Sequence, residues 1–415
     1  MSAPSCRAPF FSLRAGAVLA CGLLLAGAVA GKTTEASAVA REKEPAAAAI
    51  TEAECAAFGE EIARAVNEGD AAAVVEVFDP FALTARVTAG LEMKDDFRRG
   101  VINGIETNAR ESMRRVFDTI EKARFLRVLK VDGEFRPLVR MLTKEGGMNF
   151  HAYVVERCAS GRLKWVDMHV CLAGELMSET MRRLLLPAVA EQNAGLFERL
   201  TRGEGEYMKN LPKLTEVQKK LQAGDLAGAK AILDGFPQEL RRMKPILAMR
   251  LLVAQKTDEA AYLGVIKEWE ACFPGDPSLA LIGIDGSFLR KDYEGSLNCL
   301  AELRRYTGED PYLDFLEAST LRLAKRHPES RAAARRCLAA DPAMANAYDV
   351  LLVIELSERN HAGVAALLTE VETNYPGADM AKGIANLAEY AEFRDSPEYG
   401  RWVAGRIRQV AAPVN

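Results

Sequence analysis

The sequence predicts an α+β domain followed by an all-α array of helix pairs. Apolar residues recur every three or four positions from residue 95 to 123, which is the period of a helix, and alternate from residue 125 to 172, which is the period of a strand. In the C-terminal half, four prolines lie 34, 31 and 34 residues apart by subtraction of their numbers: Pro277, Pro311, Pro342 and Pro376. A period of ~34 residues indicates a repeat built from one helix pair.

The composition indicates a soluble, folded protein with more than one domain. The chain has 415 residues, which is more than one ordinary core holds. It is 49% hydrophobic and 27% charged, with a net charge of -4. These values are typical of globular proteins. No basic block is interleaved with aromatic residues, so a nucleic-acid partner is not expected.

The first thirty residues have the pattern of a signal peptide. Arg7 and Arg14 precede the apolar run Ala15–Ala30, which ends in the small residues Ala28-Val29-Ala30. We expect cleavage after Ala30 and a periplasmic or secreted protein. The alternative is an uncleaved anchor over residues 15–30, which is the only membrane contact expected. Residues 31–49 are rich in Ala, Glu, Lys and Thr without periodicity, and predict a flexible linker.

Residues 50–187 are expected to form the α+β domain, beginning with helices. Thr51-Glu-Ala-Glu54 reads as a capping box at the start of a first helix. A second helix ends at Asp79-Pro80. A long third helix is expected from Asp95 to Ala123, because one apolar stripe continues as far as Ile120.

Four strands are expected next, joined by turns at Asp132-Gly133, Gly146-Gly147 and Ala159-Ser-Gly161. Helices followed by a four-strand antiparallel meander, ending in Val166-Asp167-Met-His-Val170, resemble the nuclear-transport-factor-2-like (NTF2-like, also SnoaL-like or cystatin-like) α+β cone. The resemblance implies a curved sheet wrapped on the long helix, which often encloses a pocket. Members of that family are enzymes, ligand binders or dimers, so a homodimer through this domain is one possibility.

Polar residues alternate along the last two strands of this sheet. Asn149 to Cys158 and Leu163 to Leu172 can pair so that their apolar residues form one continuous face. This register sets His151 opposite His169 and Tyr153 opposite Asp167. The four polar side chains would then share one face, as a solvated surface or dimer seam, as a ligand pocket, or as a site where His151 and Asp167 act as an acid/base pair.

Residues 188–210 are expected to be a helical connector, and residues 211–406 the repeats. In the best unit, Tyr348, Leu351 and Leu352 precede Val364, Leu368 and Pro376, and turns of the type Gly224-Asp225 and Lys291-Asp292 recur upstream. The pattern resembles the tetratricopeptide (TPR) repeat; an irregular helical bundle is the alternative. The resemblance implies that the first helices line a concave groove, with these candidate partner contacts: Met249, Arg250, Asp285, Phe288, Asp314, Glu317, Asn346 and Asp349.

These patterns predict an exported scaffold that binds a protein or peptide partner through its repeats. The sequence has four histidines and no spacing typical of a zinc, nucleotide or nucleophile site. We therefore expect no enzyme activity, no catalytic residue, no metal and no cofactor. The alternative function is small-molecule binding or weak catalysis in a pocket formed by His151, Tyr153, Asp167 and His169.

Overall fold

The structure is a computed structural model that describes residues 49–144, 146–192, 209–276 and 278–411. The expected signal peptide, almost all of the linker and most of the connector lie outside the described residues. Within the described chain, residues up to Gly286 form one compact unit and residues from Ser287 form a second. No helix in the described ranges has both the length and the apolar character of a membrane span.

The first unit begins with the expected capping box. Helix α2 (Glu52–Asn67) starts at Thr51, whose side chain accepts from the Glu54 amide while the Glu54 carboxylate accepts from the Thr51 amide. This exchange satisfies two amides that the first turn of a helix leaves without partners. Two short helices follow, α3 (Ala71–Glu76) and α4 (Pro80–Thr88).

The long helix α5 (Asp95–Phe117) is shorter than expected, and the predicted end at Ala123 is wrong. The helix stops at Asp118, and strand β1 (Ile120–Val131) already includes the residue that completed the apolar stripe. Ile120 lies just beyond the end of the helix, where it is buried and pairs with Thr143 in the sheet. Its burial as a strand residue explains why apolar spacing could not place the end of the helix.

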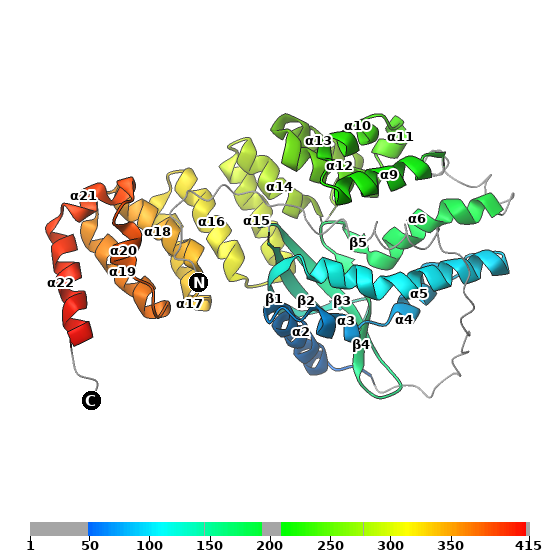
Figure 1. Ribbon diagram of the computed structural model, residues 1–415, viewed down its shortest axis with the longest axis horizontal. Helices are drawn as coiled ribbons and strands as arrows, with labels where there is room; N and C mark the ends of the chain where they lie inside the picture. Colours follow the sequence, from blue (N-terminus) through cyan, green and yellow to red (C-terminus); the bar gives the residue numbers. More distant parts are fainter. Residues whose placement is uncertain (1–48, 145, 193–208, 277, 412–415) are drawn as a thin grey trace. The chain divides into compact units, whose positions relative to one another are not determined.

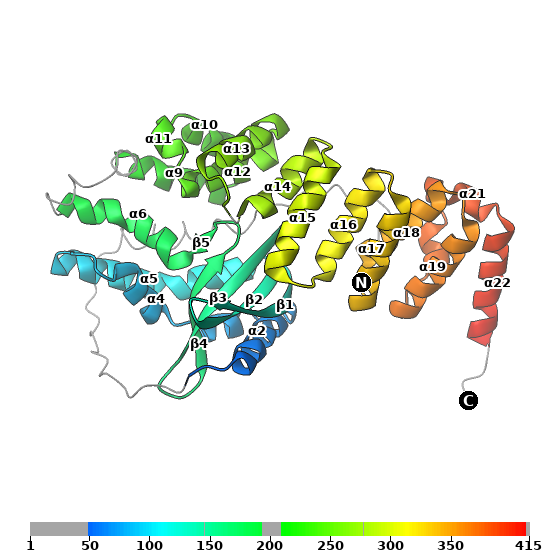
Figure 2. The ribbon, with the colours of Figure 1, turned by 180° about the vertical axis from the view of Figure 1, so that it is seen from behind.

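Five strands, rather than four, form one antiparallel sheet in the order β1-β2-β3-β4-β5. The additional strand, β5, has two residues and precedes helix α6 (Met177–Gln192). Figure 2 shows the strands from behind, and Figure 1 shows α2 and α5 beside the sheet. The remaining strands are β2 (Glu134–Thr143), β3 (Met148–Arg157), β4 (Leu163–Val170) and β5 (Glu175–Leu176).

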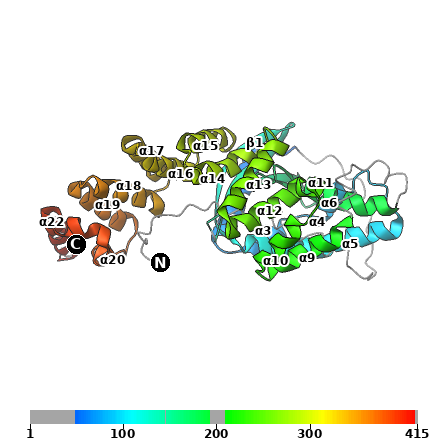
Figure 3. The same cartoon turned by 90° about the horizontal axis from the view of Figure 1, so that it is seen from above.

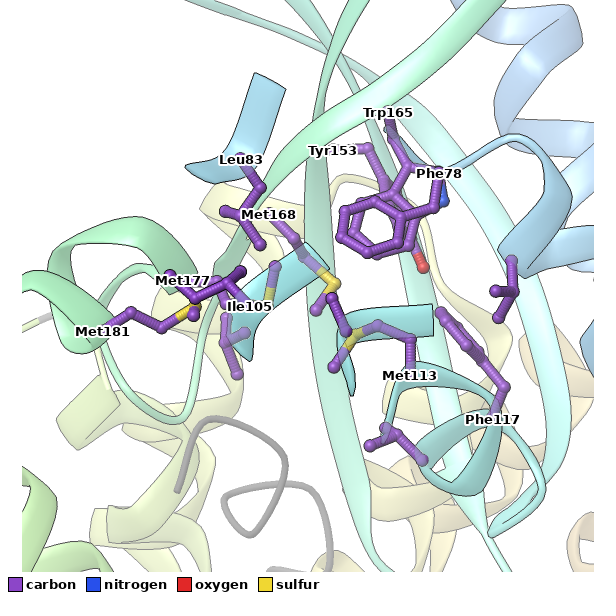
Figure 4. Close-up of a cluster of buried hydrophobic side chains, with 14 of the residues drawn as sticks. Phe78, Leu83, Ile105, Met113, Phe117, Tyr153, Trp165, Met168, Met177 and Met181 are labelled. Carbon is purple, nitrogen blue, oxygen red and sulfur yellow. The ribbon is translucent and has the colours of Figure 1, made fainter. Parts of the chain in front are cut away.

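An apolar core lies between the sheet and the helices of this domain (Figure 4). Trp165 of β4 stacks on Phe78, with ring centroids 4.0 Å apart, and both side chains are fully buried. Tyr153 meets the edge of Trp165 at a centroid distance of 5.7 Å. Burying one Phe-sized side chain contributes about 1.5–3 kcal/mol, so this aromatic group fixes the position of β4 against the helices.

The remaining helices form successive pairs. The second helices of four pairs begin at residues 259, 293, 327 and 361, which are 34 residues apart in each case. The pairs are α9 (Leu211–Gln222) with α10 (Leu226–Asp234), α12 (Lys244–Thr257) with α13 (Glu259–Cys272), α14 (Ser278–Leu289) with α15 (Tyr293–Thr307), α16 (Pro311–Leu323) with α17 (His327–Ala340), and α18 (Ala345–Ser357) with α19 (His361–Asn374).

Short helices and one long helix complete the described chain. Helix α11 (Gln238–Arg241) lies between the first two pairs. After α19 come α20 (Met380–Ile384), the 3₁₀ turn η2 (Ala388–Tyr390), α21 (Ala391–Arg394) and α22 (Pro397–Ala411). In the second unit, α16 contacts α17 and α18, and α18 contacts α19 (Figure 3). Each helix of this series therefore packs on neighbours in the same and the next pair.

The same turn joins the two helices of several pairs. Lys291, Lys325 and Arg359 stand 34 residues apart, and each has a positive φ of 56° to 60°. The next amide bonds the carbonyl five residues back, as in Asn360 to Glu355 at 2.9 Å. Left-handed backbone costs a non-glycine residue about 1–2 kcal/mol, so the repetition indicates that the turn is set by the packing of the pair.

Candidate functional site

The observed pairing of β3 with β4 differs from the expected register by one residue, so that expectation is wrong. His151 pairs with Val170, and Ala152 pairs with His169. Further along, Tyr153 faces Met168 and Val154 faces Asp167. Directly paired residues project to the same face of a sheet. His151 and Tyr153 therefore lie on one face, and Asp167 and His169 lie on the other.

Burial of both sheet faces explains the difference. The predicted register rested on one apolar face and one polar face, but all residues from Met148 to Val155 are buried. Because both faces are covered, the alternation of polar and apolar residues does not determine the register. A register shift between Val154 and Val155 lets Trp165 pair with Val155 and enter the core against Phe78. Aromatic packing, rather than polar alternation, is consistent with the observed arrangement.

Three polar residues of β3 lie on the core face of the sheet. Asn149, His151 and Tyr153 are each at most 2% exposed. Each has a buried polar atom without a hydrogen-bond partner in the described part of the chain: Asn149 Nδ2, His151 Nδ1 and the Tyr153 hydroxyl. Leaving such an atom unpaired costs roughly 1–3 kcal/mol. The predicted register placed His151 and Tyr153 on the same face as Asp167 and His169, whereas the structure places the two pairs on opposite faces.

Burial keeps both ionisable members of this row neutral. Burial, and secondarily the charge of His169, lowers the pKa of His151 to about 4. Burial also raises the pKa of Tyr153. The two rings meet edge to face with centroids 6.3 Å apart. At neutral pH the pair can offer neutral donors and acceptors to a ligand, but no charge.

Asp167 and His169 occupy a different environment. The Asp167 carboxylate accepts from the Ser178 hydroxyl at 2.5 Å and from the Ser178 amide at 3.1 Å, while burial raises its pKa. The pKa of His169 is lowered by burial and then by the positive charges of Arg136 and Lys244. Because Asp167 is held by Ser178 and lies on the opposite face from His151, the structure does not form the third alternative for these residues, an acid/base pair of His151 with Asp167.

A buried ion pair holds the turn between β4 and β5 against the helices of the first unit. Lys244 at the start of α12 pairs with Asp276, and both side chains are largely buried. Gly174 lies against this pair with a φ of +65°, and an added Cβ would stand 2.6 Å from the Asp276 carboxylate. Glycine is required here both for its backbone conformation and for the close approach.

Among the candidate partner contacts, Met249 and Arg250 lie on α12 and are half-buried. Arg250 donates to Glu268 at 2.7 Å and lines a hollow of about 280 Å³ between α10, α12 and α13. Asp285 is buried and accepts from Tyr262 at 3.0 Å, and Phe288 is half-buried. Arg250 and Asp285 thus have partners inside the first unit.

Asp314 and Glu317 also pair within the chain. Asp314 is buried and Glu317 is half-buried, and both contact the guanidinium groups of Arg304 and Arg336 at 2.8 to 3.3 Å. Burial raises the pKa of Asp314, against the effect of the two arginines. The structure therefore places these acids at the joint between α15, α16 and α17 rather than on an open face.

Arg304, Glu317 and Arg336 also line a hollow of about 550 Å³ between α15, α16 and α17. It resembles the hollow at Arg250 with the charges exchanged. The seventh residue of α12 and the tenth of α13 form the pair Arg250–Glu268, whereas the same positions of α16 and α17 hold Glu317 and Arg336. Equivalent helix positions thus carry equivalent pairs in both units.

Asn346 and Asp349 lie on the least buried face of α18. Asn346 is exposed and Asp349 is half-buried. The same face includes Val353, whose side chain is 41% exposed, and half-buried Leu356. Sequence reasoning missed these last two residues, although their spacing of four and then three from Asp349 was visible and follows one helix face.

Within the described ranges, no group of three or more His, Cys, Asp and Glu side chains is arranged to hold a metal ion. Comparison of the chain with protein-family models, with curated proteins and with solved structures finds no match. The class defined by the fold is an α+β domain joined to successive helix pairs, and any function must be argued from the residues described above.

Proposed function

We propose that the chain is an exported scaffold that binds a polypeptide partner on the first helices of TPR-like repeats. The observation that carries the proposal is the 34-residue spacing of the second helices, together with the recurring turn at Lys291, Lys325 and Arg359. Helix pairs stacked with a fixed period create extended surfaces on which proteins bind other polypeptides. Export is supported by Arg14, the apolar run 15–30 and Ala28-Val29-Ala30.

The helix α18 is the part of the array best suited to such contact. Most of its residues from Ala347 to Glu355 are buried, whereas Asn346 and Val353 are exposed and Asp349 between them is half-buried. The candidates Asp285 and Asp314 have side-chain partners inside their own units, so we assign them to packing. The proposed surface is therefore narrower than the eight residues expected from the sequence.

The proposal is tested by photo-crosslinking in the native host. A photoreactive amino acid is placed in the full chain at Asn346, at Val353 or, as a control, at Glu302, an exposed residue of α15. We expect Asn346 and Val353 to crosslink to the same polypeptide, which then binds the purified chain with a measurable Kd. Crosslinks that are equal from all three positions, or absent from the first two, would refute the proposal.

A second candidate function is supported by the unpaired atoms of Asn149, His151 and Tyr153. A small neutral ligand with hydrogen-bonding groups would satisfy donors and acceptors that burial now leaves unpaired. We propose that the α+β domain is NTF2-like, a fold in which such a site would lie between the sheet and the long helix. Asp167 is not part of it, because it lies on the other face of the sheet.

This second function is tested by thermal unfolding of the full chain with a library of small neutral compounds. A ligand of this site stabilises the native chain but not a Tyr153→Phe variant, which keeps the ring and removes the hydroxyl. A Tyr375→Phe variant serves as the matched control, because Tyr375 lies in the second unit. Stabilisation that is the same in all three proteins would place the ligand elsewhere.

A further inference from the structure

The least buried face of α18 has a regular geometry. Asn346, Asp349, Val353 and Leu356 are spaced by three, four and three residues, so they form one stripe along the helix. Among the described residues, Val353 and Phe81 are the two large apolar side chains with marked exposure. A single exposed apolar residue is ordinary. Val353, however, lies one helix turn from Asp349, a half-buried carboxylate.

That carboxylate belongs to Asp349, which has no ion-pair partner among the described residues. Two buried acids of the second unit, in contrast, have ion-pair partners: Asp314 pairs with Arg336, and Glu355 pairs with Arg331. Burial alone raises the pKa of Asp349 to about 7. A partly desolvated carboxylate without a counter-charge is unfavourable, so a cation placed beside it would be stabilised.

A second acidic residue, Asp341, lies near the same tyrosine as Asp349. Asp341 and Asp349 both raise the pKa of Tyr375, after the effect of burial, which places the two acids close to this ring. The Asp349 carboxylate, which has no counter-charge among the described residues, makes the local potential negative and attracts a positive group. A negatively charged or phosphorylated segment is disfavoured at this stripe for the same reason.

We propose that the stripe of Asn346, Asp349, Val353 and Leu356 binds an extended polypeptide segment in which Lys or Arg stands two residues from an apolar residue. The cation contacts Asp349, and the apolar side chain covers Val353 and Leu356. Four helix residues span about 6 Å, and two residues of an extended segment span about 6.6 Å, so the two spacings match. This inference rests on the proposed function and specifies the chemistry of its partner.

The test is selection from a random peptide display library on the immobilised full chain and on three variants. Asp349→Lys reverses the charge of the stripe, Asp349→Asn removes it with little change of shape, and Glu302→Lys reverses a charge outside the stripe. We expect the unmodified chain to enrich peptides with Lys or Arg two positions from Leu, Ile, Val, Met or Phe. A synthetic peptide of that sequence should bind Asp349→Asn and Asp349→Lys at least about tenfold more weakly, and Glu302→Lys unchanged.

The outcomes separate this inference from the function on which it rests. If no peptide of any composition is enriched, both the peptide-binding function and this inference are overturned. If peptides are enriched without the basic and apolar pair, or if the pair binds Asp349→Asn as tightly as the unmodified chain, only this inference is overturned. Circular dichroism and thermal unfolding show whether each variant is folded, and Asp349→Asn remains informative if Asp349→Lys is not.

Discussion

Acidification should destabilise the α+β domain through His151. In the unfolded chain the histidine has a pKa near 6.5, whereas burial lowers the pKa to about 4 in the folded chain. Between these values the unfolded chain binds more protons than the folded chain, so the free energy of unfolding falls as the pH falls. Above pH 6.5 this residue lowers the free energy of unfolding very little. At pH 4 we expect the free energy of unfolding to be lower by about 3 kcal/mol.

The effect is isolated by comparing the unmodified chain with a His151→Gln variant, whose side chain does not titrate. Both are unfolded in urea between pH 4 and 7.5, and pulse-labelling hydrogen exchange of peptides from Met148–Arg157 reports the sheet. Asp167 and His169 also have shifted pKa values, but both remain in the variant and largely cancel in the difference. Equal pH dependence of the two proteins would refute the assignment of a buried neutral histidine.

Three further substitutions test the packing. Gly174→Ala should destabilise the first unit by about 1–3 kcal/mol more than Gly161→Ala in urea unfolding, because only the first adds a clash to the cost of a positive φ; equal losses would contradict the clash. Asp314→Asn should cost about 1–3 kcal/mol in thermal unfolding because it leaves two arginines poorly paired, whereas Glu302→Gln should change stability by less than about 0.5 kcal/mol. Lys325→Gly should stabilise the second unit by up to about 1 kcal/mol in the same assay, because glycine adopts the positive φ without steric cost, and a loss of stability would refute that reasoning.

Local signals in the sequence predicted much of the helical structure. The capping box at Thr51 and Glu54 is present as expected. The turn at Lys291 and Asp292 also lies between two helices, as predicted from its resemblance to repeat turns. Such features depend on a few adjacent residues, so the sequence contains the information that decides them.

The candidate site was less predictable because it depends on packing between distant segments. The register of β3 and β4 follows the burial of Trp165 against Phe78, which alternation within the two strands does not reveal. Similarly, Asp314 was a candidate for partner contact, but its charge is used to join α15, α16 and α17. A charged residue on a first helix can pack or bind, and only the positions of neighbouring arginines distinguish the two roles.

The most direct test of polypeptide binding by the helix array is hydrogen exchange of the full chain with and without the polypeptide captured by crosslinking. We expect the bound partner to slow exchange in peptides that cover Ala345–Ser357, with little change in peptides that cover Met148–Arg157. Backbone amides near a bound segment are protected when binding suppresses local opening. Protection confined to the sheet, or absent from α18 at saturating partner, would contradict binding through the repeats.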